Sequence, residues 1–210
     1  MATWARVLFV GLVILGFAQP AAATFVDAVL AETGEAAITA SEIGLARALG
    51  LYDLHAAAGP IEPAEVERFA DGRLLEREAV RLEIQPKPAE LEAAWRGVAD
   101  RHGGEASLIA WLARIAVSQD WVRRLVEGDL RRRQFIDFRF RAFALVPPGE
   151  LEAALGPGPH SDAEREVVEG RLREEIVDRA LRDWLTEARG SAGVRLVPGA
   201  LPVPTPIPLP

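Results

Sequence analysis

Apolar residues recur at intervals of three and four along most of the chain. This spacing places side chains on one face of an α-helix. The clearest stripe begins at Pro63 and continues to Leu82. Comparable stripes follow at 88–103, 108–115, 118–141, 150–155 and 161–189. The pattern predicts a mainly α-helical protein in which most helices bury one face against their neighbours.

The stretch ahead of these helices has the other common period. Val26, Ala28 and Leu30 alternate with other residues, and side chains two apart lie on the same face of a β-strand. The dipeptide at 33–34 provides a turn, and a second short strand is expected at 36–38. The sequence therefore predicts a β-hairpin before the first helix.

Two helix starts carry a capping box. Thr39 precedes Glu42 by three residues, and Ser161 precedes Glu164 by the same interval. In a capping box, the hydroxyl and the carboxylate each accept a hydrogen bond from a backbone N–H that the helix leaves unpaired. The first of these helices is expected to run to about Leu54.

The N-terminal segment differs in composition from the rest. It has Arg6, an apolar run at 7–17 and small residues at 21–23. This is the pattern of a secretory signal peptide over residues 1–23, cleaved after Ala23. Because the apolar run is shorter than the roughly 20 residues that span a bilayer, we expect a periplasmic protein without stable membrane insertion after cleavage. A retained anchor is the alternative.

Charge and cysteine content narrow the expected partners. The formal net charge is −7, and the chain contains no cysteine. A net acidic surface is poorly suited to phosphate backbones, so no nucleic acid partner is expected. An exported protein without disulfides must rely on its hydrophobic core for stability.

Four stretches, in their order along the chain, resemble the peptide-binding chaperone domain of the SurA family and its relatives among exported parvulin-type prolyl isomerases. They are VDAVLAETGEAAITASEI at 26–43 and the longer stretches at 72–95, 102–143 and 172–197. The order of the elements, with a strand at each end, is the specific part. The resemblance implies that a strand at 194–197 pairs with the N-terminal hairpin.

The same resemblance bears on domain organisation. In that family an isomerase domain commonly separates an N-terminal helical portion from a returning C-terminal helix. Here the corresponding portions, 24–155 and 161–197, are joined directly at 156–160 (GPGPH). The resemblance implies one helical domain over 24–197, mainly α with a small β element, and no isomerase domain. The Pro-rich segment 198–210 is expected to be a disordered tail.

Large aromatic side chains on the expected helices are the candidate peptide-binding residues, because a chaperone needs apolar surface that its own fold leaves open. The candidates are Trp95, Trp111, Trp121, Phe138, Phe140 and Phe143. Core packing is the alternative for each tryptophan. For the Arg- and Phe-rich run at 123–143, the alternative is an amphipathic helix whose phenylalanines enter the core and whose arginines pair with glutamates.

No motif in the chain indicates catalysis. The three histidines have no metal-ligand spacing, and no nucleophile or phosphate-loop motif is present. We therefore expect no metal, cofactor or catalytic site. The resemblance implies ATP-independent binding of unfolded or extended polypeptides, with outer-membrane protein precursors as candidate clients. A divergent prolyl isomerase, a scaffold with one folded partner and a homodimer remain open.

Overall fold

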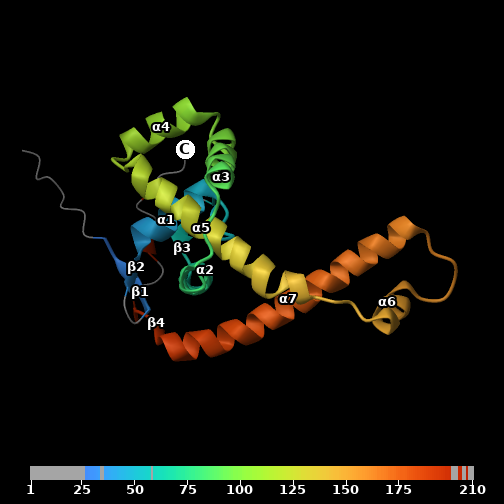
Figure 1. Cartoon of the computed structure of the whole chain (residues 1–210). Coiled ribbons are helices and arrows are strands. Elements are labelled where there is room, and N and C mark those ends of the chain that lie inside the picture. Colours follow the sequence, from blue (N-terminus) through green and yellow to red (C-terminus); the bar gives the residue numbers. More distant parts are fainter. Residues whose placement is uncertain (1–26, 34–35, 58, 200–202, 205–206, 208–210) are drawn as a thin grey trace, which may run out of the picture.

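The computed structural model describes residues 27–33, 36–57, 59–199, 203–204 and 207 (Figure 1). In chain order the elements are β1 (Val29–Thr33), β2 (Ala36–Thr39), α1 (Ala40–Leu49), β3 (Pro60–Ile61), α2 (Pro63–Arg81), α3 (Pro88–Arg101), α4 (Glu105–Arg114), α5 (Gln119–Arg139), the 3-10 turn η1 (Arg141–Phe143), α6 (Pro148–Leu155), α7 (Asp162–Ala192), β4 (Val194–Leu196) and β5 (Val203–Pro204). The expected fold class, mainly helical with a small β element, is confirmed.

The N-terminal segment expected to be a signal peptide, residues 1–23, lies outside the described residues. Among the helices that are described, none combines the length and the apolar character needed to span a bilayer.

A three-stranded antiparallel sheet joins the two ends of the chain. Strand β1 lies between β2 and β4, with Glu32 opposite Ala37 on one side and Arg195 on the other. The expected hairpin and its pairing with the C-terminal strand are therefore confirmed. The simple alternation is not, because the register shifts between Val29 and Ala31, and both Leu30 and Ala31 are buried. Such a bulge turns two successive side chains toward the core.

Helices α2 and α5 pack closely around the ring of Tyr52. A Cβ atom at Gly72 of α2 would lie 2.4 Å from Tyr52 Cδ1. A Cβ atom at Gly128 of α5 would lie 2.4 Å from the Tyr52 hydroxyl oxygen. Since neither position has room for a side chain, the two glycines set the separation of the helices. The Tyr52 ring also packs on Phe69, with centroids 4.8 Å apart.

Helix α1 ends earlier than the apolar pattern suggested. It stops at Leu49, and Gly50 caps it in the left-handed conformation at φ 64°. Tyr52 and Asp53 also have positive φ values, 56° and 55°, which are unfavourable for residues with a Cβ. The Asp129 carboxylate accepts a hydrogen bond from the Tyr52 backbone N–H at 2.9 Å and fixes this turn. The extension to Leu54 is therefore wrong, although Leu54 itself is buried.

The long helix α7 leaves the compact part of the molecule and carries α6 at its far end (Figure 1). We call residues 146–175 the arm, and no residue in it is buried. The C-terminal half of α7 packs against the rest of the protein through a second, smaller core. There Trp184 lies against Phe135 and Phe140, with ring centroids 5.5 and 6.3 Å apart.

Described residues of the Pro-rich segment 198–210 pack against the rest of the protein, which contradicts the disordered tail that its composition suggested. Strand β5 pairs antiparallel with β3, with Pro204 opposite Pro60. Ile207 is only 6% exposed and belongs to the main core. The pairing is physically reasonable because proline fits extended backbone at a sheet edge, and burying the Ile207 side chain removes apolar surface from water.

Candidate peptide-binding groove

Three of the six candidate aromatic residues belong to the core. Trp95, Trp111 and Phe140 are 1%, 2% and 9% exposed, so the expectation that they form an open binding surface is wrong. Trp95 is further fixed because its indole N–H donates to Glu105 at 2.9 Å. The Phe140 ring packs edge-on against Phe135, with centroids 5.9 Å apart. Core packing, the alternative interpretation, holds for all three.

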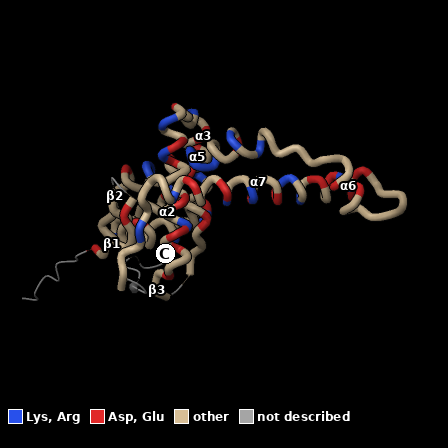
Figure 2. The backbone as a smooth tube through the Cα atoms, turned by 90° about the horizontal axis from the view of Figure 1, so that it is seen from below, with Lys and Arg blue, Asp and Glu red and all other residues tan. Residues whose placement is uncertain are grey.

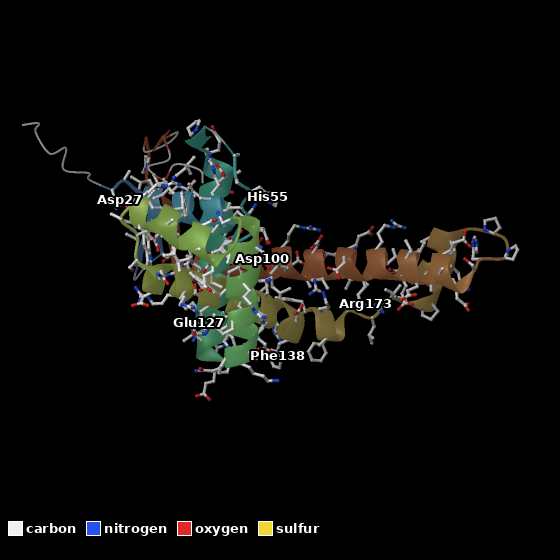
Figure 3. The ribbon with its side chains drawn as sticks, turned by 90° about the horizontal axis from the view of Figure 1, so that it is seen from above. Asp27, His55, Asp100, Glu127, Phe138 and Arg173 are labelled. Carbon is white, nitrogen blue, oxygen red and sulfur yellow. The ribbon has the colours of Figure 1, made fainter. Side chains whose placement is uncertain are left out.

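The other three candidates lie at two separate places. Phe138 and Phe143, at the end of α5 and in η1, are 59% and 73% exposed. Figure 3 shows the Phe138 ring pointing away from α7. Trp121 is half-buried at the start of α5 and lines a hollow formed with α1 and α2. The candidates therefore do not form one site.

Five of the seven arginines of the run at 123–143 pair with carboxylates. Three of them pair with glutamates, as the amphipathic-helix interpretation predicted, and the other two pair only with aspartates. The pairs are Arg123 with Glu92, Arg131 with Glu127, Arg132 with Asp53 and Asp129, Arg133 with Asp129, and Arg141 with Asp137 and Glu174. Arg124 and Arg139 have no ion pair with any described residue. Phe135 and Phe140 are buried, which confirms that interpretation for half of the phenylalanines.

Two hollows lie side by side over α2 and share Arg73 and Glu76. We call them together the groove. The first hollow, about 230 Å³, lies between the hairpin and α2 and is lined by Thr33, Ala36, Arg73, Glu76, Arg77 and Val80. The second, about 260 Å³, lies between α1, α2 and α5 and is lined by Glu42, Arg73, Glu76, Trp121, Arg124, Leu125, Glu127 and Arg131.

The floor of the groove is held by a hydrogen-bonded triad. Glu76 Oε2 accepts from the Tyr52 hydroxyl at 2.9 Å and from Arg73 Nη1 at 2.7 Å. Burial raises the pKa of Tyr52, and the neighbouring Glu76 charge raises it further, so Tyr52 stays a neutral donor. Burial alone would lower the pKa of Arg73, but Glu76 and Tyr52 outweigh it and raise this pKa. The charged pair on the floor is thus fixed in place.

The second hollow contains polar groups without partners in the described structure. Arg124 forms no ion pair there, and the buried Arg131 Nε atom has no hydrogen-bond acceptor. At its α1 end, Glu42 Oε2 accepts from the Thr39 backbone N–H at 3.3 Å. Burial raises the pKa of Glu42, although the Arg73 charge and the Thr39 N–H act in the opposite direction. This hollow can therefore accept further hydrogen-bonding groups.

Among the described residues, no strand pairs with the outer edge of β2, and this strand begins at the first hollow. Strand β2 is an edge of the three-stranded sheet, and its first residue, Ala36, lines the hollow. Thr33 and Ala36 face each other across a two-residue connection. Since the closing residues of such hairpins bond to each other, we infer that Ala37 directs its backbone N–H and C=O to the open edge. Ala37 is exposed.

Sequence reasoning found Trp121 but missed the α2 side of the groove. Arg73, Glu76, Arg77 and Val80 look like an ordinary solvated helix face, and only the packing of the hairpin and α5 on either side makes them a floor. The unusual signal was Gly72, a residue that costs a helix interior about 1 kcal/mol relative to alanine. Its reason is the Tyr52 ring that supports Glu76 from below.

Within the described part of the chain, no group of three or more His, Asp and Glu side chains is placed to hold a metal ion. The chain matches no protein-family model, and comparison with curated proteins found no match.

Proposed function

We propose that the protein binds extended or unfolded polypeptide segments in the groove, as an ATP-independent holding chaperone of the periplasm. The observation that carries the proposal is the open edge of β2 beside a groove with a fixed, charged floor. An exposed strand edge pairs readily with an added strand, which is a common mode of peptide recognition.

Recognition would use two kinds of contact: backbone hydrogen bonds at β2 and side-chain contacts in the two hollows. The client backbone bonds to the N–H and C=O of Ala37, a contact that is the same for every sequence. Client side chains two residues apart point to the same side of a strand. One of them enters the first hollow, against Val80 and the aliphatic part of Arg77. Polar groups of the client meet Arg124 and Arg131 in the second hollow.

This arrangement favours weak binding of many clients over tight binding of one. Backbone pairing does not read sequence, and the mixed charges of the second hollow accept both donors and acceptors. Binding an unfolded chain by mass action lowers the concentration that is free to aggregate, and no nucleotide is required. The proposal agrees with the function implied by the SurA resemblance, and it moves the binding surface from the buried tryptophans to the groove.

The proposal can be tested with a permanently unfolded, carboxymethylated polypeptide carrying a fluorescent label. Ala37→Pro removes the N–H that we assign to the open edge and leaves the opposite edge of β2 unchanged. Binding measured by fluorescence anisotropy should weaken by about tenfold or more. Ala37→Val is the matched control, because it keeps the N–H and suits a strand. It should bind within about twofold of the unmodified protein.

A second variant tests the hollow itself. Val80→Asp places a charge in the first hollow at a side chain that is 54% exposed, so folding should be little affected. Weaker binding of apolar clients by about fivefold is expected. Equal binding by Ala37→Pro and the unmodified protein would contradict the proposal. Failure to bind any unfolded chain, with capture of a single folded protein, would favour the scaffold alternative.

A further inference from the structure

The most exposed large apolar side chains of the described residues gather at the arm and where it leaves the protein. Phe138, Phe143 and Leu145 are 59%, 73% and 81% exposed, and Val167 is 72% exposed. We call residues 138–145 the base of the arm and residues 150–167 its tip. Apolar surface that remains in water is usually the site of an interaction when it is concentrated in one region.

The arm has little that would stabilise it within a single chain. Helix α6 packs against α7, but neither helix buries a residue between 146 and 175. Short helices in water are marginal by propensity alone and depend on tertiary packing of an apolar face. The ion pairs Arg165–Glu152 and Arg141–Glu174 are exposed, and such pairs add little. Further contacts are needed to hold the arm in one conformation.

The arm and the helix that leads to it carry opposite charges. Residues 146–175 contain eight carboxylates and three arginines, a net charge of −5. Residues 119–143 contain four carboxylates and seven arginines, a net charge of +3. Figure 2 shows acidic residues gathered at α6 and at the adjacent end of α7. The base itself, residues 138–145, contributes two of these arginines and no carboxylate, so the acidic tip and the base carry charges of opposite sign.

Two charges without an ion pair lie near the two ends of this arrangement. Arg139 at the base has no ion pair with a described residue, and neither does Glu166 at the tip. Arg141 of the base contacts Glu174 at 3.0 Å, which places the base beside this part of α7. Arg139 and Glu166 of one chain are therefore too far apart to meet. Glu166 precedes Glu174 by eight residues, about 12 Å along the helix.

A glycine lies midway between tip and base. Gly170 is inside α7, and a Cβ atom added there would meet nothing within 4 Å. Glycine costs an exposed helix about 1 kcal/mol relative to alanine, and the chain's own packing does not require it here. A small residue at this place allows the backbone of another helix to come close.

We propose that two copies of this chain pair through their arms, antiparallel, about a twofold axis near Gly170. Each tip then lies against the base of the other copy. Val167 packs against Phe143 and Leu145 of the second copy, and Glu166 meets Arg139. Such an interface is self-complementary, and the axis makes each contact occur twice. The groove over α2 is outside the interface, so this dimer does not depend on the proposed peptide binding.

The first test enlarges the side chain at the proposed twofold axis. The dimer dissociation constant of the purified protein is measured by sedimentation equilibrium. Gly170→Leu should raise the dimer dissociation constant by about tenfold or more, because the side chain keeps the helices apart. It should not lower the stability of the monomer, since the space is open and leucine favours helix. Gly190→Leu, at a second open glycine of α7 outside the interface, is the control and should leave the dimer unchanged.

Charge exchange gives the second test. Arg139→Glu and Glu166→Arg should each weaken the dimer by about fivefold or more, and the double variant should restore it, because the pair is re-formed with reversed signs. Arg114→Glu, an equal charge change on α4, should have no effect. A chain that remains monomeric to about 100 μM, or a double variant as weak as the two single ones, would overturn the proposal. The variant Ala37→Pro should dimerise normally, which separates this interface from the groove.

Discussion

The body of the protein and the arm are built from similar helices but are stabilised differently. Helices α1 and α7 both begin with a complete capping box. Nevertheless α1 buries eight of its ten residues, while α7 buries only Val177 in 31 residues. The capping box fixes where a helix begins, but it does not decide whether the helix is covered. Tertiary packing makes the body one cooperative unit and leaves the arm dependent on a small core at its base.

The largest effect should come from the buried charges of the body. Asp129 is 4% exposed and accepts from the Tyr52 N–H at 2.9 Å and from Arg132 at 2.9 and 3.1 Å. Asp129→Ala leaves the buried Arg132 guanidinium with Asp53 as its main partner. It also removes the acceptor that holds the strained turn at Tyr52. We expect a loss of about 3–5 kcal/mol in the free energy of unfolding, measured by denaturant titration.

Asp137 provides the matched control on the same helix. Its carboxylate pairs with Arg141 at the surface, and both side chains are about half exposed. Asp137→Ala should therefore cost less than about 1 kcal/mol. If Asp129→Ala also cost less than about 1 kcal/mol, the buried network would not be what fixes α5 to the turn after α1.

The second largest effect should be a loss of stability in α7 that the helices of the body do not share. Trp184→Ala removes the ring that packs on Phe135 and Phe140 in the small core. We expect a loss of about 3 kcal/mol in the protection of α7, seen as faster amide hydrogen exchange. Exchange in α3 and α4 should not change. Arg182→Ala, at an exposed position of the same helix, is the control, and equally faster exchange throughout the body would contradict the separation.

The sequence predicted the elements well, because their determinants are local. The stripes at three and four, the prolines at helix starts and the two capping boxes lie within a few residues of the boundaries that they set. The failures depended on distant contacts. Nothing between Leu49 and Leu54 shows that Asp129, far along the chain, would hold the Tyr52 N–H and end α1 early.

The candidate site was predicted less well, for a related reason. An aromatic residue on an amphipathic helix fits a core and a binding surface equally, and only the neighbouring helices decide between them. Trp95 and Trp121 look alike in the sequence, but α3 is covered by α4 and α5 at Trp95, while Trp121 lies at the rim of the groove. The floor residues of α2 were missed because a charged helix face is usually solvated.

A third, smaller effect should show that the C-terminal segment belongs to the body. Ile207 is 6% exposed in the main core, although composition alone placed it in a disordered tail. Ile207→Ala should lower the free energy of unfolding by about 2 kcal/mol, because buried methyl groups are lost. Pro198→Ala, at an exposed position nearby, should be close to neutral. A neutral Ile207→Ala would restore the tail interpretation.

The smallest expected effect is on how stability depends on pH, and it differs between the two capping boxes. Burial in the body raises the pKa of Glu42, although the Arg73 charge and the Thr39 N–H oppose it. In the arm, the Ser161 backbone N–H and hydroxyl lower the pKa of Glu164. A carboxyl whose pKa is raised by folding costs stability once it ionises, whereas one whose pKa is lowered adds stability that is lost as the pH falls.

Glutamine keeps the hydrogen bond to the backbone N–H and removes the titration, so Glu42→Gln and Glu164→Gln should diverge with pH. Between about pH 4 and pH 7, the stability of the unmodified protein should fall relative to Glu42→Gln. At lower pH, from about pH 3 to pH 5, it should rise with pH relative to Glu164→Gln, because the lowered pKa of Glu164 places this titration below the ordinary glutamate range. Both comparisons are measured by denaturant titration at each pH. The opposite signs follow from which cause is largest at each box. Burial is the largest at Glu42, and the hydrogen bonds from Ser161 are the largest at Glu164. If the stability difference changed with pH in the same direction for both variants, burial by the body would not be what distinguishes the two helix starts.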